Sequence, residues 1–420
     1  MLSSQVVGTI LLGTLGLVGG VLLGQIYLSS TALRAQRELK GSRDLPVGSG
    51  PRLYSVVILS AGLIALVAGG EAFAIRAVWQ RYLAAPATPP HRMIAYVSDQ
   101  NGSNDIGLMD EYGHTRALTF SMANEREPHW SPDGQWIAFV SNQEGNDDIF
   151  LISPEGHSIR QLTHTPEDEG WISWSPDGRS ILFTREAPTE KQLCVVNVDQ
   201  VEGNATGERC IFKTDGQINK PSFSPDGQEI AFNFGHNGWF QLWLINSDGT
   251  DARALDPTTQ SGIAAWSPDE KRIVYRVATD YNKPSDVQII SLDDMERHHV
   301  HHIEASQVQA NWSPDGQKLY FTSDPSDPPL EEMGRLGIMN ADGSKLIWLD
   351  DGINWVYGQS QSWQIETWDE NNRILYSHQE AGQYDLYLIN ADGTHRMRLT
   401  FGAGNKFHAV FRPVPPLKQR

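Results

Sequence analysis

Several motifs that usually mark a catalytic or metal site are absent from this chain. It has no CxxC pair, no HExxH, no phosphate-binding glycine loop and no GxSxG nucleophile motif. The nearest stretch, GQSQS at 358–362, lacks the final glycine, and too little chain follows residue 413 to hold a hydrolase domain. We therefore expect no catalytic residue, no metal and no cofactor.

Cysteine is scarce, with only Cys194 and Cys210 in 420 residues. They flank the hairpin LCVVNVDQVEGNATGERCIF, and folding it about residue 202 sets them opposite each other. An oxidising compartment would allow a cross-strand disulfide, and two buried thiols are the alternative. We favour the disulfide because the topology predicted from the N-terminal segment is extracytoplasmic.

Basic residues are also few, and they are unevenly distributed. Residues 1–92 hold eight Lys and Arg against three Asp and Glu, which leaves 25 basic and 48 acidic residues, a net charge of −23, in the rest. Such an acidic domain repels phosphate backbones, so we expect no nucleic-acid partner. It would also be repelled by an anionic membrane surface.

Two long apolar runs near the N-terminus predict a membrane hairpin. The first covers about 6–28 and the second about 53–78, each long enough to cross a bilayer. A cleaved signal peptide would explain the first run but not the second. The loop 29–52 carries five basic residues against two acidic ones, so the positive-inside rule places it in the cytoplasm. Everything after the second run, including the linker 84–92, would then face the periplasm or the extracellular side of the plasma (inner) membrane.

Small residues recur every fourth position in both predicted spans. Such spacing puts them on one helix face, where backbones approach closely. We interpret this as a packed hairpin or a dimer seam, the alternative being that Gly and Ala are common in membrane spans. The residues are Gly16, Gly20 and Gly24 in the first span and Ala61, Ala65 and Gly69 in the second.

One five-residue motif recurs through the rest of the chain. WSPDG, or a close variant of it, begins at residues 130, 174, 223, 266 and 312, and a decayed copy, WDENN, begins at 368. Pro, Asp and Gly suit successive positions of a type I turn. We read the motif aspartates as turn formers, because their carboxylates can accept backbone N–H groups. Runs rich in Ile, Val, Phe and Tyr follow each turn, so each unit predicts one strand before the turn and three after it.

The period of this repeat predicts a β-propeller. The second strands of successive units begin 42 to 56 residues apart, and four strands at that period are typical of a propeller blade. The first unit lacks its leading strand, and NKFHAVFRPV near the C-terminus has no continuation. We predict that the C-terminal strand completes the first blade. The fold is then all-β, a seven-bladed propeller over 93–413 with a tail at 414–420. Six blades remain the alternative if 324–372 is an irregular insertion.

The pattern WSPDG…IAF…LWLINSDGT…LT resembles the TolB-type, WD40-like propeller repeat over most of the chain. The resemblance implies the propeller fold, but this repeat occurs in secreted binding proteins, envelope scaffolds, some lyases and the non-catalytic domain of some peptidases. The chain also departs from TolB itself, which carries a small α/β domain where this sequence has its apolar runs.

Two polar clusters have a metal-binding and a bland interpretation. RHHVHH at 297–302 could chelate zinc on a strand, but a polar outer edge strand explains it better. The loops GSNDI (102–106) and GNDDI (145–149) could hold calcium, but such clusters are more often turns.

The loops opposite the SPDG turns are longer and carry aromatic and acidic residues. Aromatic loop residues on a rigid scaffold often form a recognition surface, and the alternative is that they pack in the seams between blades. The candidates are Trp171, Trp239, Phe240, Trp355 and Tyr357, with Glu167, Asp168 and Glu169.

The sequence thus predicts a membrane-anchored, extracytoplasmic propeller that binds protein or an envelope polymer without catalysis. One alternative is a propeller enzyme of the lyase or hydrolase type. The other is a sensor that signals through the spans, for which the loop 29–52 is short.

The topology prediction can be tested with single cysteines placed at residues 42 and 90 of a variant without Cys194 and Cys210. A membrane-impermeant maleimide applied to intact cells should label residue 90 and spare residue 42. Labelling of residue 42 before permeabilisation would contradict the extracytoplasmic assignment.

Overall fold

The structure is a computed structural model that describes residues 92–198, 207–255, 260–278, 285–303, 308–323, 334–353 and 368–413. By compactness the chain divides into Met1–Pro89 and Pro90–Arg420, and all described residues belong to the second unit. The predicted spans and their small-residue faces lie outside the described residues. Within the described ranges, no helix has the length and hydropathy needed to cross a membrane.

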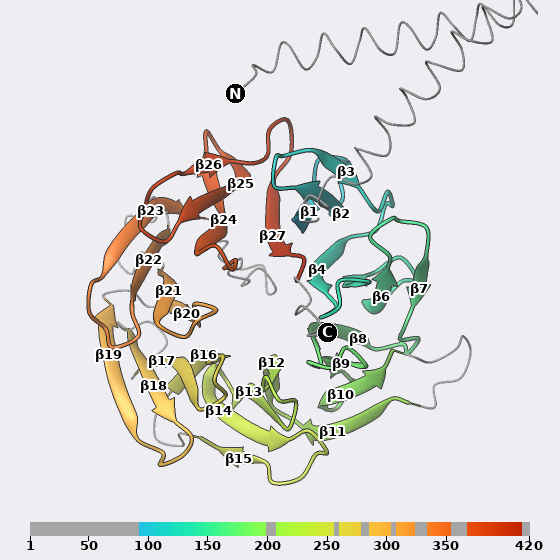
Figure 1. Ribbon diagram of the computed structural model, residues 1–420. Coiled ribbons are helices and arrows are strands. Elements are labelled where there is room, and N and C mark those ends of the chain that lie inside the picture. The colour runs from blue at the N-terminus through green and yellow to red at the C-terminus, as the bar shows by residue number, and fades with distance from the viewer. Residues whose placement is uncertain are drawn as a thin grey trace, which may run out of the picture. The chain divides into compact units, whose positions relative to one another are not determined.

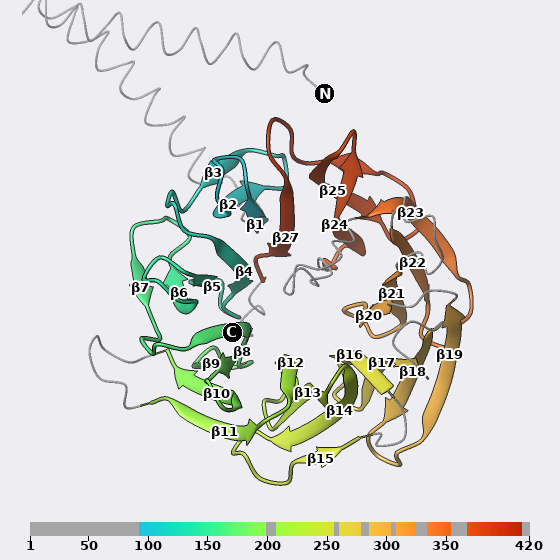
Figure 2. The same ribbon diagram turned by 180° about the vertical axis from the view of Figure 1, so that it is seen from behind.

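Seven blades surround a common axis, and the chain passes through them clockwise in the view of Figure 1, with the reverse side in Figure 2. From the innermost strand outward, blade 1 is β27 (Lys406–Phe411), β1 (Met93–Ser98), β2 (Asp105–Asp110) and β3 (Thr115–Ala117). Blade 2 is β4 (Glu125–Trp130), β5 (Ile137–Ser141), β6 (Asp148–Ile152) and β7 (Ile159–Gln161). Blade 3 is β8 (Asp168–Trp174), β9 (Ser180–Glu186), β10 (Lys191–Asn197) and β11 (Arg209–Thr214). Blade 4 is β12 (Gln217–Phe223), β13 (Glu229–His236), β14 (Trp239–Asn246) and β15 (Arg253–Ala254).

The remaining blades follow the same order. Blade 5 is β16 (Gln260–Trp266), β17 (Arg272–Ala278), β18 (Ser285–Ser291) and β19 (Arg297–Ile303). Blade 6 is β20 (Val308–Trp312), β21 (Lys318–Ser323), β22 (Gly334–Asn340) and β23 (Ile347–Ile353). Blade 7 is β24 (Arg373–Glu380), β25 (Gln383–Asn390) and β26 (Met397–Arg398), with Trp368 bridged to Ile374 on its inner side. The predictions of an all-β fold and of seven blades are confirmed, and blades 1 to 6 each have the predicted four strands.

The hydrophobic core lies between the blades. Strands β5 and β6 are buried along their whole length, because each face of a sheet packs against a neighbouring sheet. One cluster joins Val97 and Leu108 of blade 1 to Ile137 and Phe139 of blade 2. Equivalent clusters lie between the other blades. A blade therefore gains most of its apolar burial only when both neighbours are present.

The SPDG turns have the predicted chemistry. In blade 3, the Asp177 carboxylate accepts the Ser175 hydroxyl at 2.7 Å and the Arg179 N–H at 3.0 Å. These bonds lower the pKa of Asp177, the Ser175 hydroxyl bond being the larger cause. The same pair of bonds recurs at Asp133, Asp226, Asp269 and Asp315.

The motif tryptophans join neighbouring blades. The indole N–H of Trp174 donates to the backbone carbonyl of His129, in the innermost strand of the preceding blade, at 3.0 Å. Trp130 donates in the same way to Val410, and Trp312 to Ala265, both at 3.1 Å. The motif thus builds a turn and fixes the seam beside it.

The C-terminal strand closes the ring, as the sequence predicted. β27 pairs antiparallel with β1, and Arg412 N–H donates to the Met93 carbonyl at 2.7 Å. Asp99 accepts Asn405 Nδ2 at 2.8 Å, which ties the other end of β27 to blade 1. Blade 1 therefore consists of strands from both ends of the propeller sequence.

Removal of β27 should disrupt cooperative folding. Deleting residues 405–420 strips β1 of its inner partner and leaves an unpaired edge next to exposed core. We expect aggregation or loss of a single sharp thermal transition. Deleting only 414–420, which spares β27, should leave the melting curve unchanged. If the 405–420 deletion melts like the full chain, the closing strand does not hold the ring together.

Candidate functional site

The two faces of the ring differ in their loops. We call the face with the SPDG turns and the turns between third and fourth strands the turn face. The loops between second and third strands, and those that lead to the next blade, form the open face. Hydrogen bonds connect loops on the same face: Arg116 donates to the Glu155 carbonyl on the turn face, and Asn146 to the Thr165 and Glu167 carbonyls on the open face.

The aromatic candidates of the open face are placed differently from one another. Trp239 ends the β13–β14 turn and is 47% exposed, whereas Phe240 beside it is half-buried. The turn is held in place because Gln260 donates to the Gly238 carbonyl at 2.7 Å. Trp355 and Tyr357 lie outside the described residues.

The acidic candidates divide between surface and interior. Asp168 is exposed and accepts the Asp147 N–H at 3.0 Å, while Glu167 is half-buried. Glu169 was expected on the same rim, and that placement is wrong. It is 1% exposed and forms an ion pair with Arg185 at 2.9 Å, because β8 turns it into the seam with blade 2.

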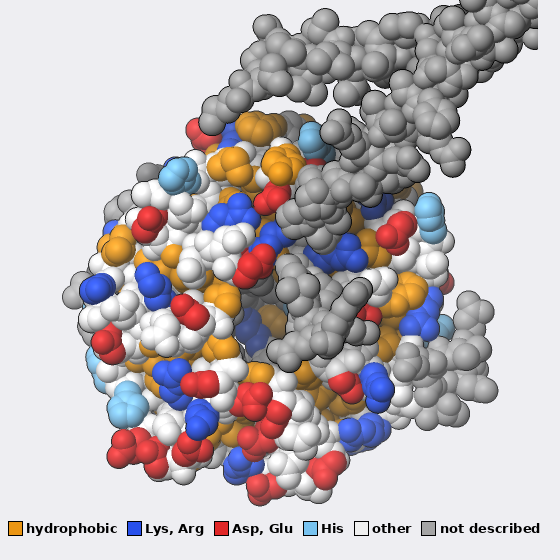
Figure 3. All heavy atoms as spheres, in the orientation of Figure 1, with side chains coloured by type: hydrophobic (Ala, Val, Ile, Leu, Met, Phe, Trp, Pro, Cys, Tyr) orange, Lys and Arg blue, Asp and Glu red, His pale blue; other side chains and the backbone are white. Residues whose placement is uncertain are grey.

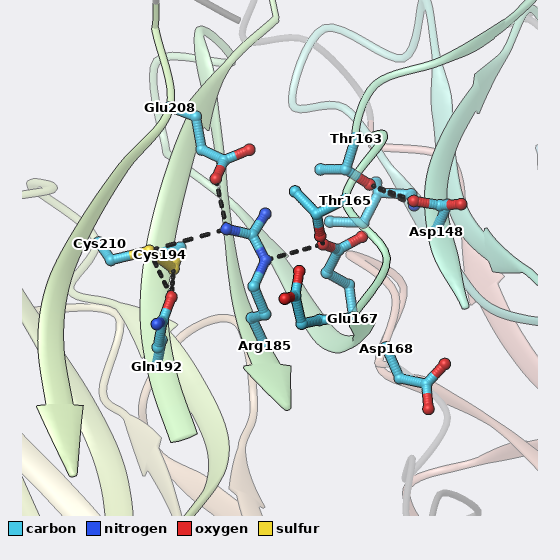
Figure 4. A network of polar contacts seen from close by, with 12 residues as sticks. Asp148, Thr163, Thr165, Glu167, Asp168, Arg185, Gln192, Cys194, Glu208 and Cys210 are labelled. Atoms are coloured by element: carbon cyan, nitrogen blue, oxygen red, sulfur yellow. Dashed lines mark hydrogen bonds and ion pairs between the residues drawn. A yellow bond between two sulfur atoms is a disulfide. The ribbon is translucent and has the colours of Figure 1, made fainter. Parts of the chain in front are cut away.

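Glu169 belongs to a polar network between blades 2 and 3. Figure 4 shows Asp148, Arg185 and Glu208 of this network. Arg185 bridges Glu169 and Glu208, at 2.9 and 2.5 Å, while the Asp168 carboxylate lies apart from them. Burial and the nearby Glu169 carboxylate raise the pKa of Asp148 to about 7. Two buried carboxyl groups thus meet where both cannot readily be ionised.

The two cysteines lie at the edge of this network. A disulfide joins Cys194 on β10 to Cys210 on β11, which are paired in the sheet. Arg185 lies beside Cys210, so the disulfide holds β11 next to the ion pairs (Figure 4).

Trp171 stands on an innermost strand instead of in a loop. Its backbone has a φ of 50°, and the pairing of β8 with β9 is interrupted by a bulge at this point. The Lys220 ammonium of blade 4 lies 5.6 Å from the centre of its ring, a cation–π contact. Trp171 is thus half-exposed and contacts the innermost strand of the next blade.

The same bulge recurs around the inner wall of the ring. Glu127 on β4, Lys220 on β12 and His408 on β27 also have φ near 50°, each at a register shift of its strand. A positive φ in a residue other than glycine is strained and is often found at functional sites. We call Glu127, Trp171, Lys220 and His408 the inner-ring residues.

Charged groups of blades 2 and 4 influence one another at the inner ring. Glu127 is fully buried, accepts the Ile172 N–H at 3.3 Å, and has a pKa raised by burial. Burial lowers the pKa of Lys220 well below its usual value, against the opposing effect of Glu127. Arg126 pairs with Asp147 at 2.9 Å. Proton transfer or the binding of a polar ligand is chemically feasible here.

Sequence reasoning missed the inner ring because its members are far apart in the chain. Glu127, Trp171 and Lys220 stand in three different repeats, and only ring closure brings His408 near His129. Burial, together with the nearby His408, lowers the pKa of His129 to about 4. The available signal was a polar or bulky residue at the third or fourth position of each innermost strand.

The predicted metal alternatives gain no support among the described residues, where no three His, Cys, Asp or Glu side chains gather. His299 stands on the outer strand β19 beside Asp286 at 3.4 Å. In the two acidic loops, Asp105 accepts Asn101 and Asp147 pairs with Arg126. One face of the ring, with acidic and basic side chains interspersed and a hollow near the middle, is shown in Figure 3.

Comparisons with known proteins agree with this fold. Residues 70–257 match the family described as TolB beta propeller domain. A protein of Agrobacterium fabrum, "Uncharacterized protein Atu1656", is 28% identical over 165 residues, which cover 36% of this chain and 53% of that protein. The chain therefore matches about half the length of that relative.

Solved structures with the same fold include enzymes. An oligogalacturonate lyase in complex with manganese superposes with a TM-score of 0.58 at 16% identity, covering 70% of this chain and 85% of the lyase. A puromycin-hydrolyzing peptidase of Mycobacterium tuberculosis gives 0.55 at 13% identity, covering 71% and 50%. At these identities the likeness extends to the fold alone.

The carboxyl pair predicts a specific dependence of stability on pH. The pKa of Asp148 is raised in the folded protein, so the folded state binds more protons than the unfolded state between about pH 4 and about 7. Stability should therefore fall as pH rises through this window. Asp148→Asn removes the ionisation. The free energy of unfolding of this variant, relative to that of the wild type, should therefore rise by about 1 kcal/mol or more between pH 4 and 7.5.

Denaturant unfolding of both proteins across this pH range measures the difference. Glu144→Gln, which changes an exposed carboxylate, is the control and should follow the wild type. A constant difference between Asp148→Asn and the wild type would show that Asp148 titrates normally.

Proposed function

The chain carries a TolB-like β-propeller, and from this premise we propose that it is a non-catalytic module that binds a protein or envelope component through its open face. The membrane hairpin predicted from residues 6–28 and 53–78 would anchor it, with the propeller on the periplasmic or extracellular side.

The observation that carries this proposal is the position of the two ends of the propeller. β1 begins at Met93 beside the last residues of β27, and Trp130, which begins the first SPDG turn, donates to Val410. Both ends therefore emerge on the turn face. On the opposite, open face, the Trp239 side chain is 47% exposed and therefore accessible to a partner.

Two further observations support the extracytoplasmic setting. The Cys194–Cys210 disulfide suits an oxidising compartment. The excess of basic residues in the loop 29–52 favours that loop inside the cell. Both agree with a propeller outside the cytoplasm.

An enzymatic role is the alternative, and the inner ring is where it would reside. We favour binding because the charges there are used within the wall: Arg126 pairs with Asp147, and Glu127 accepts a backbone N–H of the next blade. Such contacts fix the innermost strands and leave fewer groups for a substrate.

The proposal is tested by substitutions on the two faces of the full-length protein. A photo-crosslinker at residue 239 in living cells should yield a protein adduct, and one at Asp248, exposed on the turn face, should not. Trp239→Ser should weaken binding of the captured partner about tenfold or more and leave the melting temperature unchanged, because the ring is half-exposed.

Asp177→Ala serves as the matched control. It should cost about 1 kcal/mol of stability by removing the turn bonds and leave partner binding intact. Adducts at residue 248 alone, or loss of binding in Asp177→Ala at normal stability, would mean that the turn face is the binding face.

A further inference from the structure

A continuous strip of five loops crosses the open face from blade 7 to the start of blade 3. Resting on the proposed function, we infer that this strip docks a protein segment carrying both basic and apolar side chains. The loops are 399–405, 99–104, 118–124, 142–147 and 162–168.

One half of the strip is apolar and exposed. Phe120 is 78% exposed, Met122 is 99% exposed and Phe401 is 70% exposed. Phe120 and Met122 come from the loop that leads into blade 2, and Phe401 from the loop that leads into β27. Clustered exposed apolar side chains favour aggregation unless a partner covers them, so they often mark an interaction site.

Hydrogen bonds hold these apolar side chains on a fixed surface. Asn405 donates to the Asp99 carboxylate at 2.8 Å, which joins the loop of Phe401 to the 99–104 loop. On the other side of that loop, Ser103 donates to the Ser121 carbonyl at 2.8 Å, beside Phe120 and Met122. The three apolar residues thus flank one tethered loop. A surface that is already ordered loses little entropy when a partner binds.

The other half of the strip is acidic. Asn124 N–H donates to the Asn142 side chain at 2.9 Å, which connects the apolar half to the 142–147 loop. That loop carries the exposed Glu144, and Asn146 joins it to the next loop, where Asp168 is exposed and Glu167 half-exposed. None of the five loops contains a lysine or arginine in its sequence.

The charge of the strip selects its occupant. Acidic loops attract lysine and arginine side chains and repel surfaces of their own sign. A second copy of this chain would bring another acidic propeller, and an anionic bilayer would be repelled for the same reason. A segment with apolar side chains towards one end and basic side chains towards the other complements both halves, since its apolar groups cover Phe120, Met122 and Phe401 while its basic groups reach Glu144 and Asp168.

The test uses the full-length protein in phosphatidylcholine nanodiscs and fluorescent synthetic peptides. One peptide combines lysine with leucine, a second replaces lysine by glutamate, and a third replaces leucine by serine. Fluorescence anisotropy should give binding of the lysine–leucine peptide that is at least about tenfold tighter than of the other two. Equal binding of all three peptides would overturn the inference.

Variants then locate the peptide on the strip. Phe120→Ser, Met122→Ser and Phe401→Ser combined should weaken binding about tenfold or more, with unchanged melting because all three are exposed. Tyr112→Ser combined with Met397→Ser changes exposed apolar residues elsewhere and is the matched control. Equal loss in both variants, or none in the first, contradicts the assignment.

The acidic half is tested by Glu144→Gln, Glu167→Gln and Asp168→Asn together. This variant should weaken binding several-fold at low salt and have a much smaller effect at about 0.5 M salt, where charges are screened. Its control is Glu155→Gln with Glu296→Gln, both exposed on the turn face. A salt-independent affinity would overturn the role of charge.

The outcomes separate this inference from the proposed function. A protein adduct at residue 239, together with unchanged peptide affinity in the Phe120, Met122 and Phe401 variant, would support the proposed binding role. It would contradict the strip as the docking site. If the same variant loses peptide binding but residue 239 yields no protein adduct in cells, the strip binds such peptides and the proposed partner-binding role is contradicted. Concentration-dependent self-association through the strip would identify a second copy as the occupant and overturn the inference.

Discussion

A four-stranded sheet with two apolar faces can bury both only between two other sheets, and this requirement governs the whole propeller. Every described core cluster combines residues of adjacent blades, so no blade is complete alone. The pairing of β27 with β1 satisfies the requirement for the two ends of the sequence at once. It also places both of those ends on the turn face.

The repeated motif connects local turn chemistry to this global requirement. Ser and Asp of SPDG order the corner between first and second strands, and the preceding Trp bonds to the backbone of the neighbouring blade. At the decayed copy, Asp369 still accepts the Arg373 N–H at 2.8 Å, and Asn372 has the positive φ that glycine has elsewhere. The turn is therefore retained in WDENN, although most of the motif residues have changed.

The charged residues in the seams differ from one seam to the next, although the hydrogen bonds to threonine beside them recur. Asp105 and Asp148 begin the third strand of their blades, and Asp385 is the third residue of β25. The residue after each aspartate donates its N–H to a threonine hydroxyl at 2.8 to 2.9 Å. Across two of these seams lies a glutamate, Glu125 or Glu169, whose pKa is raised mainly by burial. Between blades 7 and 1 the equivalent residue is a lysine, Lys406, whose ammonium group donates to backbone carbonyls of residues 403 and 404. Like charges thus face each other between blades 1 and 2 and between blades 2 and 3, whereas opposite charges face each other between blades 7 and 1.

The sequence alone predicted the repeat, the strands of each unit and the turn role of the motif aspartates, because these depend on residues within one repeat. Its period and its incomplete first and last units favoured seven blades with a closing C-terminal strand, and the structure decided against six blades. Pairing of Cys194 with Cys210 was also local, being set by one hairpin. Only the tertiary structure showed which side chains of different repeats lie close together. Glu169 lies in a seam instead of on the rim. Trp171 contacts Lys220 of the next blade where both innermost strands are bulged. The loops that carry Phe401 and Phe120 are both hydrogen-bonded to the 99–104 loop, because β27 returns to β1. Distances in the chain carry no information about such neighbours until the ring is closed.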